Sequence, residues 1–334
     1  MAPGAESGSG LAGRVLVIGN LNVDLVFYPV RDLPAWGEER TVDLMLTRAA
    51  GSAGYSALAL GNLGMRPVVI GNVGCDGYRT FILRELTEAG ADVTRVQVSG
   101  LPTGVSATMT NKEGARAFVT YLGHLAELTA EALLPAIRAV GDVKQALFSG
   151  YFLLPSLGVE GAMSVLRACS DEGALTLFDS GWAPHGWSPE TRQDLCRLVS
   201  EVDVFLPNHE EAMAITGRPD PTSAAQALLE LGVGTVIIKA GEAGSLALDR
   251  QRGLVRQPAI PIKAFDSTGA GDSFNAGVMY GLALGWELER ILQFAGAVAG
   301  IVVSRRQGRC PTVGEAMEVV RTHFPRPGKI FSER

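Results

Sequence analysis

A short run near the carboxyl end of the chain, FDSTGAGDSFN at residues 265–275, combines small residues with carboxylate and hydroxyl side chains. Gly269, Ala270 and Gly271 lie where a helix is predicted to begin, so backbone N–H groups and the positive end of the helix dipole converge on one point. Such a point suits a phosphate group. Asp272, in the first helical turn, is placed to accept a proton from an attacking hydroxyl group. The run therefore predicts an anion hole with its own general base.

A Gly-Asp pair before a helix is by itself only a turn with an N-cap, but this run is longer. Residues 266–274, DSTGAGDSF, closely resemble the signature of the ribokinase-like (PfkB) family of sugar and nucleoside kinases. The sequence has no GxxxxGK[ST], and no GxGxxG follows its first predicted strand, which disfavours Walker-type NTPases and dinucleotide dehydrogenases. The resemblance extends over residues 14–324, with weaker motifs in the family's order.

The resemblance implies a ribokinase-like three-layer α/β/α fold, with a central mostly parallel sheet and a small β-sheet lid, in a single kinase domain over residues 14–334. It implies an ATP-dependent phosphotransferase (EC 2.7.1.-) that phosphorylates a hydroxymethyl group of a small sugar or sugar derivative, with ATP and Mg²⁺ as cofactors. Two alternatives stay open. One is a nucleoside kinase of this family, in which Tyr55 or the loop at Trp182 stacks on a base. The other is a non-catalytic sugar- or nucleotide-sensing protein on this fold.

Polar residues follow the first predicted strand, RVLVIG at residues 14–19. This continuous apolar run is typical of a strand buried on both faces, and open α/β sheets bind ligands at the carboxyl ends of such strands. Asn22 and Asp24 are two residues apart, so in an extended segment their side chains point the same way. A turn rich in Asn and Asp explains them equally well. By resemblance to the family, their side chains hold sugar hydroxyls.

A helix is predicted to start near Gly51, where the chain resembles the family's next motif imperfectly. The family has Gly-Gly at this start and an Asn that contacts sugar, whereas this chain has Ala50 first and Tyr55 at the Asn position. Ser52 stands where ribokinases carry lysine, so ribose is not the first expectation. The resemblance implies that Gly51, Ser52 and Tyr55 line the substrate together with Asp272. For Tyr55, simple packing is the alternative.

Residues 207–212, PNHEEA, contain Asn208 at a predicted N-cap and Glu211 three residues later, which is the spacing of a capping box. By resemblance, the same pair orders the magnesium and phosphate water network, so Glu211 is expected to bind Mg²⁺ through water. Both roles are compatible. By resemblance Asp266 either shapes its loop or helps to bind a monovalent cation such as K⁺, as in some relatives.

Several further residues are expected at the nucleotide only because the family places it there. The turn after the strand at residues 234–239 brushes the phosphates and ribose in the family, and adenine lies near the helix predicted over residues 288–306. Lys239 stands at a position that often carries a hydroxyl residue. The nucleotide-binding candidates are Asn208, Lys239, Gly241, Gly244, Thr268, Gly269, Gly271, Ala299 and Gly308.

The rest of the chain predicts the elements that position these residues. The second half alternates strands with helices, which is typical of βαβ units and a parallel sheet with helices on both faces. Residues 25–48 and 104–122 are β-like but broken by proline or a turn, so we expect them to form a separate lid. In the family such lids exclude water, and lids of two subunits pair, so a homodimer through the lid is expected.

Composition excludes several other classes of protein. The 334 residues carry a net charge of −6 without a Lys/Arg cluster, which argues against nucleic acid and membrane surfaces as partners. The four cysteines show no C-x-x-C spacing, so neither a zinc site nor a disulfide framework is predicted, and a cytoplasmic location fits. No signal peptide or membrane-spanning run is recognised. Residues 1–13, rich in Ala, Gly and Ser, are expected to be a disordered tail.

Overall fold

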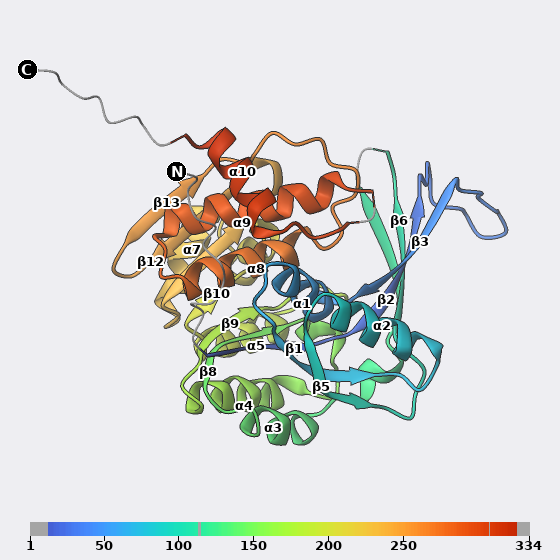
Figure 1. Ribbon diagram of the computed structural model, residues 1–334, viewed down its shortest axis with the longest axis horizontal. Helices are drawn as coiled ribbons and strands as arrows, with labels where there is room; N and C mark the ends of the chain where they lie inside the picture. The colour runs from blue at the N-terminus through green and yellow to red at the C-terminus, as the bar shows by residue number, and fades with distance from the viewer. Residues whose placement is uncertain (1–12, 113–114, 307, 326–334) are drawn as a thin grey trace, which may run out of the picture.

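The computed structural model describes residues 13–112, 115–306 and 308–325 (Figure 1). The expected tail over residues 1–13 therefore lies outside the described residues, apart from Gly13. Within the described ranges, no helix is both long and apolar enough to cross a membrane.

A large sheet forms the middle layer of the molecule. Its nine strands within the described ranges run in the order β13-β12-β11-β10-β9-β8-β1-β4-β5. Neighbours from β11 to β5 pair in parallel, and β12 pairs antiparallel with both β11 and β13. The strands are β1 Arg14–Gly19, β4 Val68–Val73, β5 Asp92–Val98, β8 Val143–Ser149, β9 Leu175–Asp179, β10 Val204–Phe205, β11 Thr235–Lys239, β12 Ser245–Asp249 and β13 Gly253–Gln257. The expected mostly parallel sheet is confirmed.

Helices cover both faces of this sheet, each over its own apolar core. The helices over one face are α1 Ser52–Asn62, α2 Gly77–Glu88, α8 Ala270–Ala283, α9 Leu288–Ser304 and α10 Val313–His323. Those over the other face are α3 Ala130–Arg138, α4 Gly158–Asp171, α5 Pro189–Val199, α6 His209–Thr216 and α7 Pro221–Glu230. Figure 1 shows α8, α9 and α10 together on one side and α3 and α4 on the other. The predicted three-layer α/β/α architecture is therefore confirmed.

A second, small sheet projects from the body at the right of Figure 1. Its strand order is β3-β2-β6-β7. The strands are β2 Asn22–Tyr28, β3 Leu44–Ala50, β6 Val105–Thr110 and β7 Arg116–Tyr121. These strands belong to the two segments expected to form a separate sheet, although β2 begins three residues earlier than expected and β3 ends two residues later. The reason is that Asn22 and Asp24 are already extended and paired with β3.

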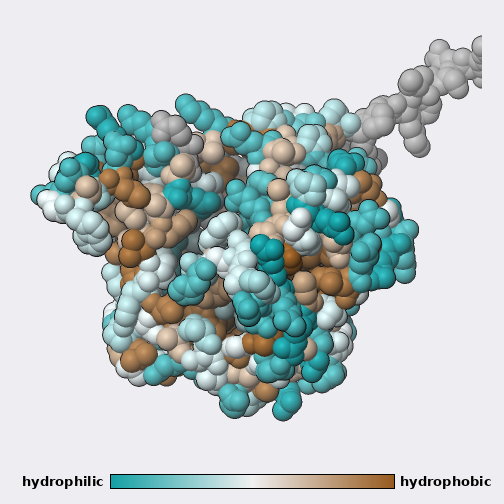
Figure 2. All heavy atoms as spheres, turned by 180° about the vertical axis from the view of Figure 1, so that it is seen from behind, coloured by the Kyte–Doolittle hydropathy of each residue, from teal (hydrophilic) through white to brown (hydrophobic). Residues whose placement is uncertain are grey.

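The two faces of the small sheet differ in chemistry. Cross-strand register places Asp24, Arg48 and Ser106 side by side on the face that carries the buried polar side chains. The opposite face, called here the outer face, is defined by Leu25, Phe27, Met45, Ala107, Met109, Ala117, Val119 and Tyr121. Met45 is 53% exposed and Val119 is 67% exposed. Seen from behind, the small sheet lies at the left of Figure 2 and carries apolar patches.

The strand order explains where ligands bind. Strand β1 lies between β4 and β8, so successive strands of the chain are added on opposite sides of it. In open parallel sheets the crevice at such a switch point, at the carboxyl ends of the strands, is the usual ligand site. The segment after β1, the last residues of β9 and β11, and the start of α6 all lie at that edge. The fold therefore gathers residues that are distant in the sequence.

Candidate active site

The predicted anion hole sits at the start of α8. Gly269 is the N-cap residue, and its φ of 76° places it in the left-handed region, where glycine is favoured. A Cβ atom on Gly269 would lie 3.1 Å from the ring of Tyr55, so the ring of this tyrosine packs directly over the glycine. The N–H groups of the first helical turn have no partner within the helix. The N–H of Ala270 donates to the backbone oxygen of Ser267 at 3.2 Å, so the N–H groups of Gly269 and Gly271 are the ones available to an anion at the point that the sequence predicts.

Asp272 stands in the first turn of α8 and is half-buried. Its carboxylate accepts no hydrogen bond from the described residues, while the hydroxyl group of Ser56 in α1 donates to its backbone oxygen at 3.2 Å. Burial and the nearby charge of Asp179 raise the pKa of Asp272 to about 8, against a lowering by Lys239. A carboxylate with no protein partner and a pKa near neutrality suits a general base.

A chain of hydrogen bonds organises the segment after β1. The side chain of Asn20 donates to Asn22 Oδ1 at 3.1 Å, and the side chain of Asn22 donates to Asp24 Oδ1, also at 3.1 Å. The side chains of Asn22 and Asp24 therefore lie on the same side, as the sequence predicts. Burial raises the pKa of Asp24 to about 6, although its hydrogen bonds oppose the rise. Asn20 was not singled out from the sequence, because only the structure shows that it begins this chain.

Tyr55 connects the two halves of the site. Its hydroxyl group donates to Asp24 Oδ2 at 2.7 Å, and its ring covers Gly269 of the anion hole. Its ring is thus packed on Gly269 and its hydroxyl group is bonded to Asp24, so Tyr55 has a packing role. Gly51 caps α1 with a φ of 93°, and a Cβ there would lie 2.2 Å from the backbone oxygen of Asn20. The backbone N–H of Ser52 donates to Asn20 Oδ1 at 3.1 Å.

Three buried side chains meet beside the anion hole, and two of them were not singled out from the sequence. Lys239, at the end of β11, donates to Asp179 Oδ2 at 2.6 Å and to Asn275 Oδ1 at 3.2 Å. Asn275 of α8 also donates to Asp179 Oδ2, at 2.6 Å. We call these residues the Lys239 cluster. A signal for Asp179 is present in the sequence, because it directly follows the strand-like run ALTLF at residues 174–178 and so lies where parallel strands meet their ligands.

Asn208 and Glu211 form a complete capping box at the start of α6. The N–H of Glu211 donates to Asn208 Oδ1 at 2.8 Å, and the N–H of Asn208 donates to Glu211 Oε2 at 2.9 Å. Only 4% of Glu211 is exposed. Burial, together with the charge of Asp179, raises the pKa of Glu211 to about 7. The capping role is confirmed, and one oxygen of the carboxylate remains free of the cap.

The donor set at this edge suits a hydrated metal ion. Within the described residues, no group of three or more His, Cys, Asp or Glu side chains could enclose a metal. Mg²⁺ keeps several waters and is bound by one or two carboxylates together with substrate phosphates. Glu211 fits that chemistry, since it is a carboxylate whose charge is disfavoured by burial and would be stabilised by a nearby cation.

Asp266 is held by the chain's own donors. Arg48 of β3 donates to its Oδ2 at 2.6 Å, and the N–H and hydroxyl groups of Thr268 donate to its Oδ1 at 3.0 and 2.8 Å. The pKa of Asp266 stays below its usual value because these interactions outweigh burial. Arg48 also donates to the backbone oxygen of Arg306 at 3.1 Å. Of the two expectations for Asp266, this geometry supports the shaping of the loop.

The structure places only some of the remaining nucleotide-binding candidates near the residues described above. Gly241 and Gly244 follow Lys239 in a tight turn, and a Cβ on Gly244 would lie 2.1 Å from the backbone oxygen of Gln257. The α-carbon of Gly308 lies next to Arg48, since a Cβ there would lie 3.3 Å from Arg48 Nη1. This places Gly308 near the Asp266 loop. Ala299 is half-buried in α9.

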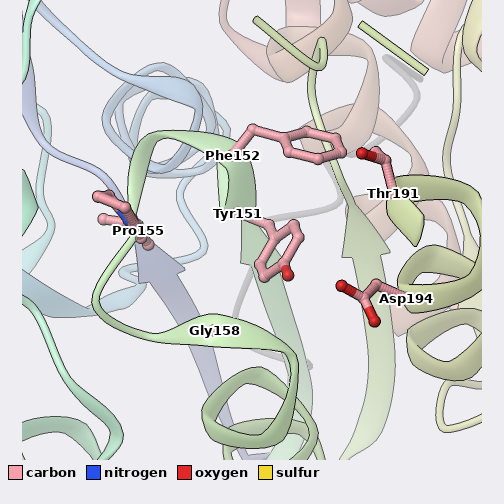
Figure 3. A pocket seen from close by; sticks show the side chains of 7 residues that line it. Tyr151, Phe152, Pro155, Gly158, Thr191 and Asp194 are labelled. Carbon is pink, nitrogen blue, oxygen red and sulfur yellow. The ribbon is translucent and has the colours of Figure 1, made fainter. Parts of the chain in front are cut away.

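A separate surface pocket of about 170 Å³ does not belong to this site. Figure 3 shows Tyr151, Phe152, Thr191 and Asp194 around it. None of the site residues predicted from the sequence lines this pocket. Trp182 packs edge-on against Trp187 with ring centroids 5.7 Å apart, so the aromatic loop is held by its own contacts. The chemistry therefore concentrates at the carboxyl edge of the large sheet.

Comparisons with known proteins agree with this geometry. A model described as pfkB family carbohydrate kinase matches residues 12–313. The 5-dehydro-2-deoxygluconokinase of Geobacillus kaustophilus is 27% identical over 283 residues, which cover 82% of this chain and 84% of that protein. The structure of Arabidopsis thaliana ribokinase complexed with ribose and ATP has a TM-score of 0.77 at 23% identity and covers 93% of this chain and 99% of that chain.

A second solved structure, a putative ribokinase II from E. coli in complex with ATP and Mg²⁺, has a TM-score of 0.80 at 21% identity. It covers 93% of this chain and 100% of that chain. These likenesses extend over nearly the whole chain, so they concern the complete α/β/α body together with the small sheet.

Proposed function

This chain belongs to the pfkB family of carbohydrate kinases, and from that premise we propose how its site carries out ATP-dependent phosphorylation of a sugar. The observation that carries the proposal is Asp272, a carboxylate with no hydrogen-bond partner in the described part of the chain, at the mouth of a helix N-terminus. The alternatives of a nucleoside kinase and of a non-catalytic sensor gain no specific support from the site. The chain is treated below as a sugar kinase.

The reaction follows from the placement of these groups. The acceptor's primary hydroxyl oxygen forms a bond to the γ-phosphorus of ATP while the bond from that phosphorus to the β–γ bridging oxygen breaks. Asp272 takes the hydroxyl proton, and ADP leaves with the electron pair. The N–H groups at Gly269 and Gly271 donate to the oxygens of the transferring group, where negative charge must be stabilised, and Ala270 connects them with its own N–H on the backbone oxygen of Ser267. In this single step Asp272 thus acts on the acceptor hydroxyl group, and the anion hole acts on the phosphoryl group.

The acceptor is held on the side of β2. Asn22 and Asp24 bind its hydroxyl groups, next to Gly51, Ser52 and Tyr55. Because the hydroxyl group of Tyr55 already occupies Asp24 Oδ2, that oxygen has less capacity for the acceptor. We propose a small sugar derivative with a hydroxymethyl group. The Geobacillus relative is named as a kinase of 5-dehydro-2-deoxygluconate, so sugar acids are the first class to test.

The nucleotide lies along the carboxyl edge, with its phosphates near Thr268, Gly269 and Gly271. The other residues proposed to contact it are Asn208, Lys239, Gly241, Gly244, Ala299 and Gly308. Glu211 would hold Mg²⁺ through water, and the ion would neutralise charge on the phosphate oxygens. The cap at Asn208 fixes the position of the Glu211 carboxylate for that role.

We also propose that the small sheet is a lid and that two lids pair in a homodimer. The outer face presents mostly apolar side chains in three rows of cross-strand neighbours, with the exposed Thr47 beside Leu25, and this supports contact with a second copy. A domain spanning residues 14–334 with one such lid is the organisation proposed. The cytoplasm is the proposed compartment, where ATP is available and four free cysteines stay reduced.

The proposal is tested by ADP release against a panel of acceptors. Sugar acids, pentoses, hexoses and nucleosides are each supplied with ATP and Mg²⁺, and both the wild type and Asp272→Asn are measured. We expect turnover on a sugar-type acceptor, and a loss of about 10²–10⁴-fold in the variant, because a general base contributes about that factor.

Two measurements control this test. Equal melting temperatures establish that Asp272→Asn is folded, and ATP affinity should change little because the backbone donors remain. A variant as active as the wild type would remove Asp272 from catalysis. A wild type inactive on every acceptor would favour the sensor.

A further inference from the structure

The Lys239 ammonium group has more donors than the protein uses. An ammonium group carries three N–H donors. Asp179 Oδ2 and Asn275 Oδ1 accept two of them, and no side chain or backbone atom of the described ranges accepts the third. The Lys239 side chain is only 12% exposed, so this donor is largely shielded from water. A buried donor without a partner is costly and therefore points to a missing acceptor.

The third donor lies beside the anion hole. A Cβ atom built on Gly271 would lie 3.5 Å from Lys239 Nζ and 3.7 and 3.8 Å from its Cδ and Cε. The aliphatic stem therefore runs along the glycine, and the ammonium group reaches the helix start where the backbone donors converge. A Cβ atom at residue 271 would be in ordinary van der Waals contact with the lysine side chain, so the lysine lies directly alongside the backbone of the anion hole.

The carboxylates around the anion hole favour a positive charge beside it. Asp272, Asp179 and Glu211 surround the place where a phosphoryl group would arrive, and the charge of Lys239 acts on both Asp272 and Glu211. A phosphoryl group brings further negative charge. Lys239 is fixed between β9, β11 and α8 and needs no rearrangement to oppose that charge, which is the arrangement that stabilises a transition state best.

We propose that Lys239 is a further catalytic residue, whose third N–H donates to the γ-phosphoryl group in the anion hole, and that Asp179 and Asn275 are positioning residues that aim it. This inference rests on the kinase function proposed above. It assigns to Lys239 a contact with the group that is transferred, beyond a place near the nucleotide. Asp179 acts through two acceptor contacts, since both Lys239 and Asn275 donate to its Oδ2.

A purely structural role makes a different prediction. If the cluster only holds β9, β11 and α8 together, the loss of Lys239 should lower the stability of the fold and weaken the binding of all nucleotides equally. If Lys239 contacts the γ-phosphoryl group, its loss should weaken the binding only of ligands that carry that group. ADP and the non-hydrolysable β,γ-imido analogue of ATP differ in this group and require no acceptor.

The experiment measures the affinity of both nucleotides by calorimetry with Mg²⁺ present. In Lys239→Met, which removes the donors but keeps the length of the side chain, we expect unchanged affinity for ADP and about 10-fold weaker binding of the imido analogue. Turnover should fall by about 10²–10³-fold, as for other removed donors to a developing oxyanion. Lys239→Gln keeps two N–H donors for the cluster and serves if Lys239→Met does not fold.

Asp179→Asn tests the positioning role. It keeps the charge of Lys239 and an acceptor oxygen, so we expect a smaller loss of turnover than in Lys239→Met, with an unchanged KM for the acceptor. The matched control is Lys144→Met, which removes an exposed lysine paired with Asp142 at the start of β8. This control should leave both nucleotide affinities and turnover unchanged.

Each result decides the inference. An unchanged ratio of the two affinities in a folded Lys239→Met protein would overturn the inference, whether both affinities stay the same or both fall equally. A wild type that binds both nucleotides but phosphorylates no acceptor would overturn the proposed function and leave the contact itself supported or refuted by the affinity ratio. A wild type that binds neither nucleotide would overturn both.

Discussion

Asp272 receives opposing influences from four other side chains. The charges of Asp179 on β9 and Asp24 on β2 raise its pKa, Lys239 on β11 and Arg116 on β7 lower it, and burial carries it to about 8. A base must be ionised to accept a proton, so activity is lost as the pH falls below this pKa. We predict that kcat/KM decreases as the pH is lowered below about 8, in a profile measured on the preferred acceptor.

The same profile in Asp179→Asn provides the control. Removing the negative charge of Asp179 lowers the pKa of Asp272, so the acidic limb should move to lower pH. A limb that stays in place, or that moves to higher pH, would show that another group titrates in the profile.

Glu211 caps α6 and is proposed to bind Mg²⁺ through water, and one substitution can distinguish these two roles. Glu211→Gln keeps the oxygen that accepts from the N–H of Asn208, so the stability of α6 should hardly change. It removes the charge that holds Mg²⁺. We predict that the Mg²⁺ concentration for half-maximal rate rises in the variant while the melting temperature stays the same.

The comparison for Glu211 is Glu315, which completes a capping box at the start of α10. Glu315→Gln should leave the magnesium titration unchanged. If Glu211→Gln does the same, capping would be the whole role of Glu211.

Residues that act through local patterns were predictable from the sequence, and residues that act through long-range contacts were not. The anion-hole run and the capping box are short motifs, in which spacing alone sets the geometry. Asp179, Asn275 and Arg48 gain their roles from partners 36 to 258 residues away. No local pattern encodes such pairings. Asp179 alone could have been suspected, from its position at a strand end.

At the scale of elements, the ion pair of Arg48 with Asp266 connects β3 of the small sheet to the loop before α8. Both side chains are buried, with 9% and 2% of their area exposed. Arg48 also binds the backbone at Arg306, so three segments meet at one guanidinium group. The anion-hole loop and the small sheet are therefore fixed relative to one another by a side-chain contact and not by strand pairing.

This ion pair leads to a prediction about monovalent cations. Both oxygens of Asp266 are engaged by Arg48 and Thr268, so a cation would have to displace a buried guanidinium group. We predict that replacing Na⁺ with K⁺ at constant ionic strength leaves the rate of ADP release unchanged. The comparison is Arg48→Gln, in which the carboxylate of Asp266 loses its charged partner.

The variant also has an expected effect on stability. Removing one partner of a buried ion pair leaves an uncompensated charge and costs about 3–5 kcal/mol, so Arg48→Gln should unfold at clearly lower denaturant concentration. Activation of the wild type by K⁺ would contradict the prediction and return Asp266 to the cation-binding expectation.

Element types were predictable where the pattern was strong. A continuous apolar run predicted β1, and the alternation of strands and helices predicted the parallel sheet. The edges of the small sheet were placed less well, because the polar residues Asn22 and Asp24 do not look like a strand. They are extended because the backbone pairs with Ala50 and Arg48, and tertiary pairing overrides their low strand propensity.

At the scale of the whole molecule, we propose that the outer face of the small sheet sets the oligomeric state. We predict a homodimer at micromolar concentration by sedimentation, and a monomer for Val119→Glu, because Val119 lies in the middle row of that face. Val119 is 67% exposed in the single chain, so the charge should disturb pairing without disturbing the fold.

Val98→Glu, on the edge strand β5, is the matched control for this prediction. Val98 is 52% exposed but lies outside the outer face, so its substitution should leave the dimer intact. A wild type that sediments only as a monomer would contradict pairing through the lid.

The direction of β1 has a practical consequence. The strand starts at Arg14 and reaches the catalytic edge at Gly19, five steps of about 3.3 Å later, so its first residue lies about 17 Å from the end that faces the substrate. The amino end of the described chain therefore enters on the opposite edge of the large sheet. A protein immobilised on a biosensor surface through this end would present its cleft to the flowing solution, whereas coupling through the outer face of the small sheet would obstruct the lid.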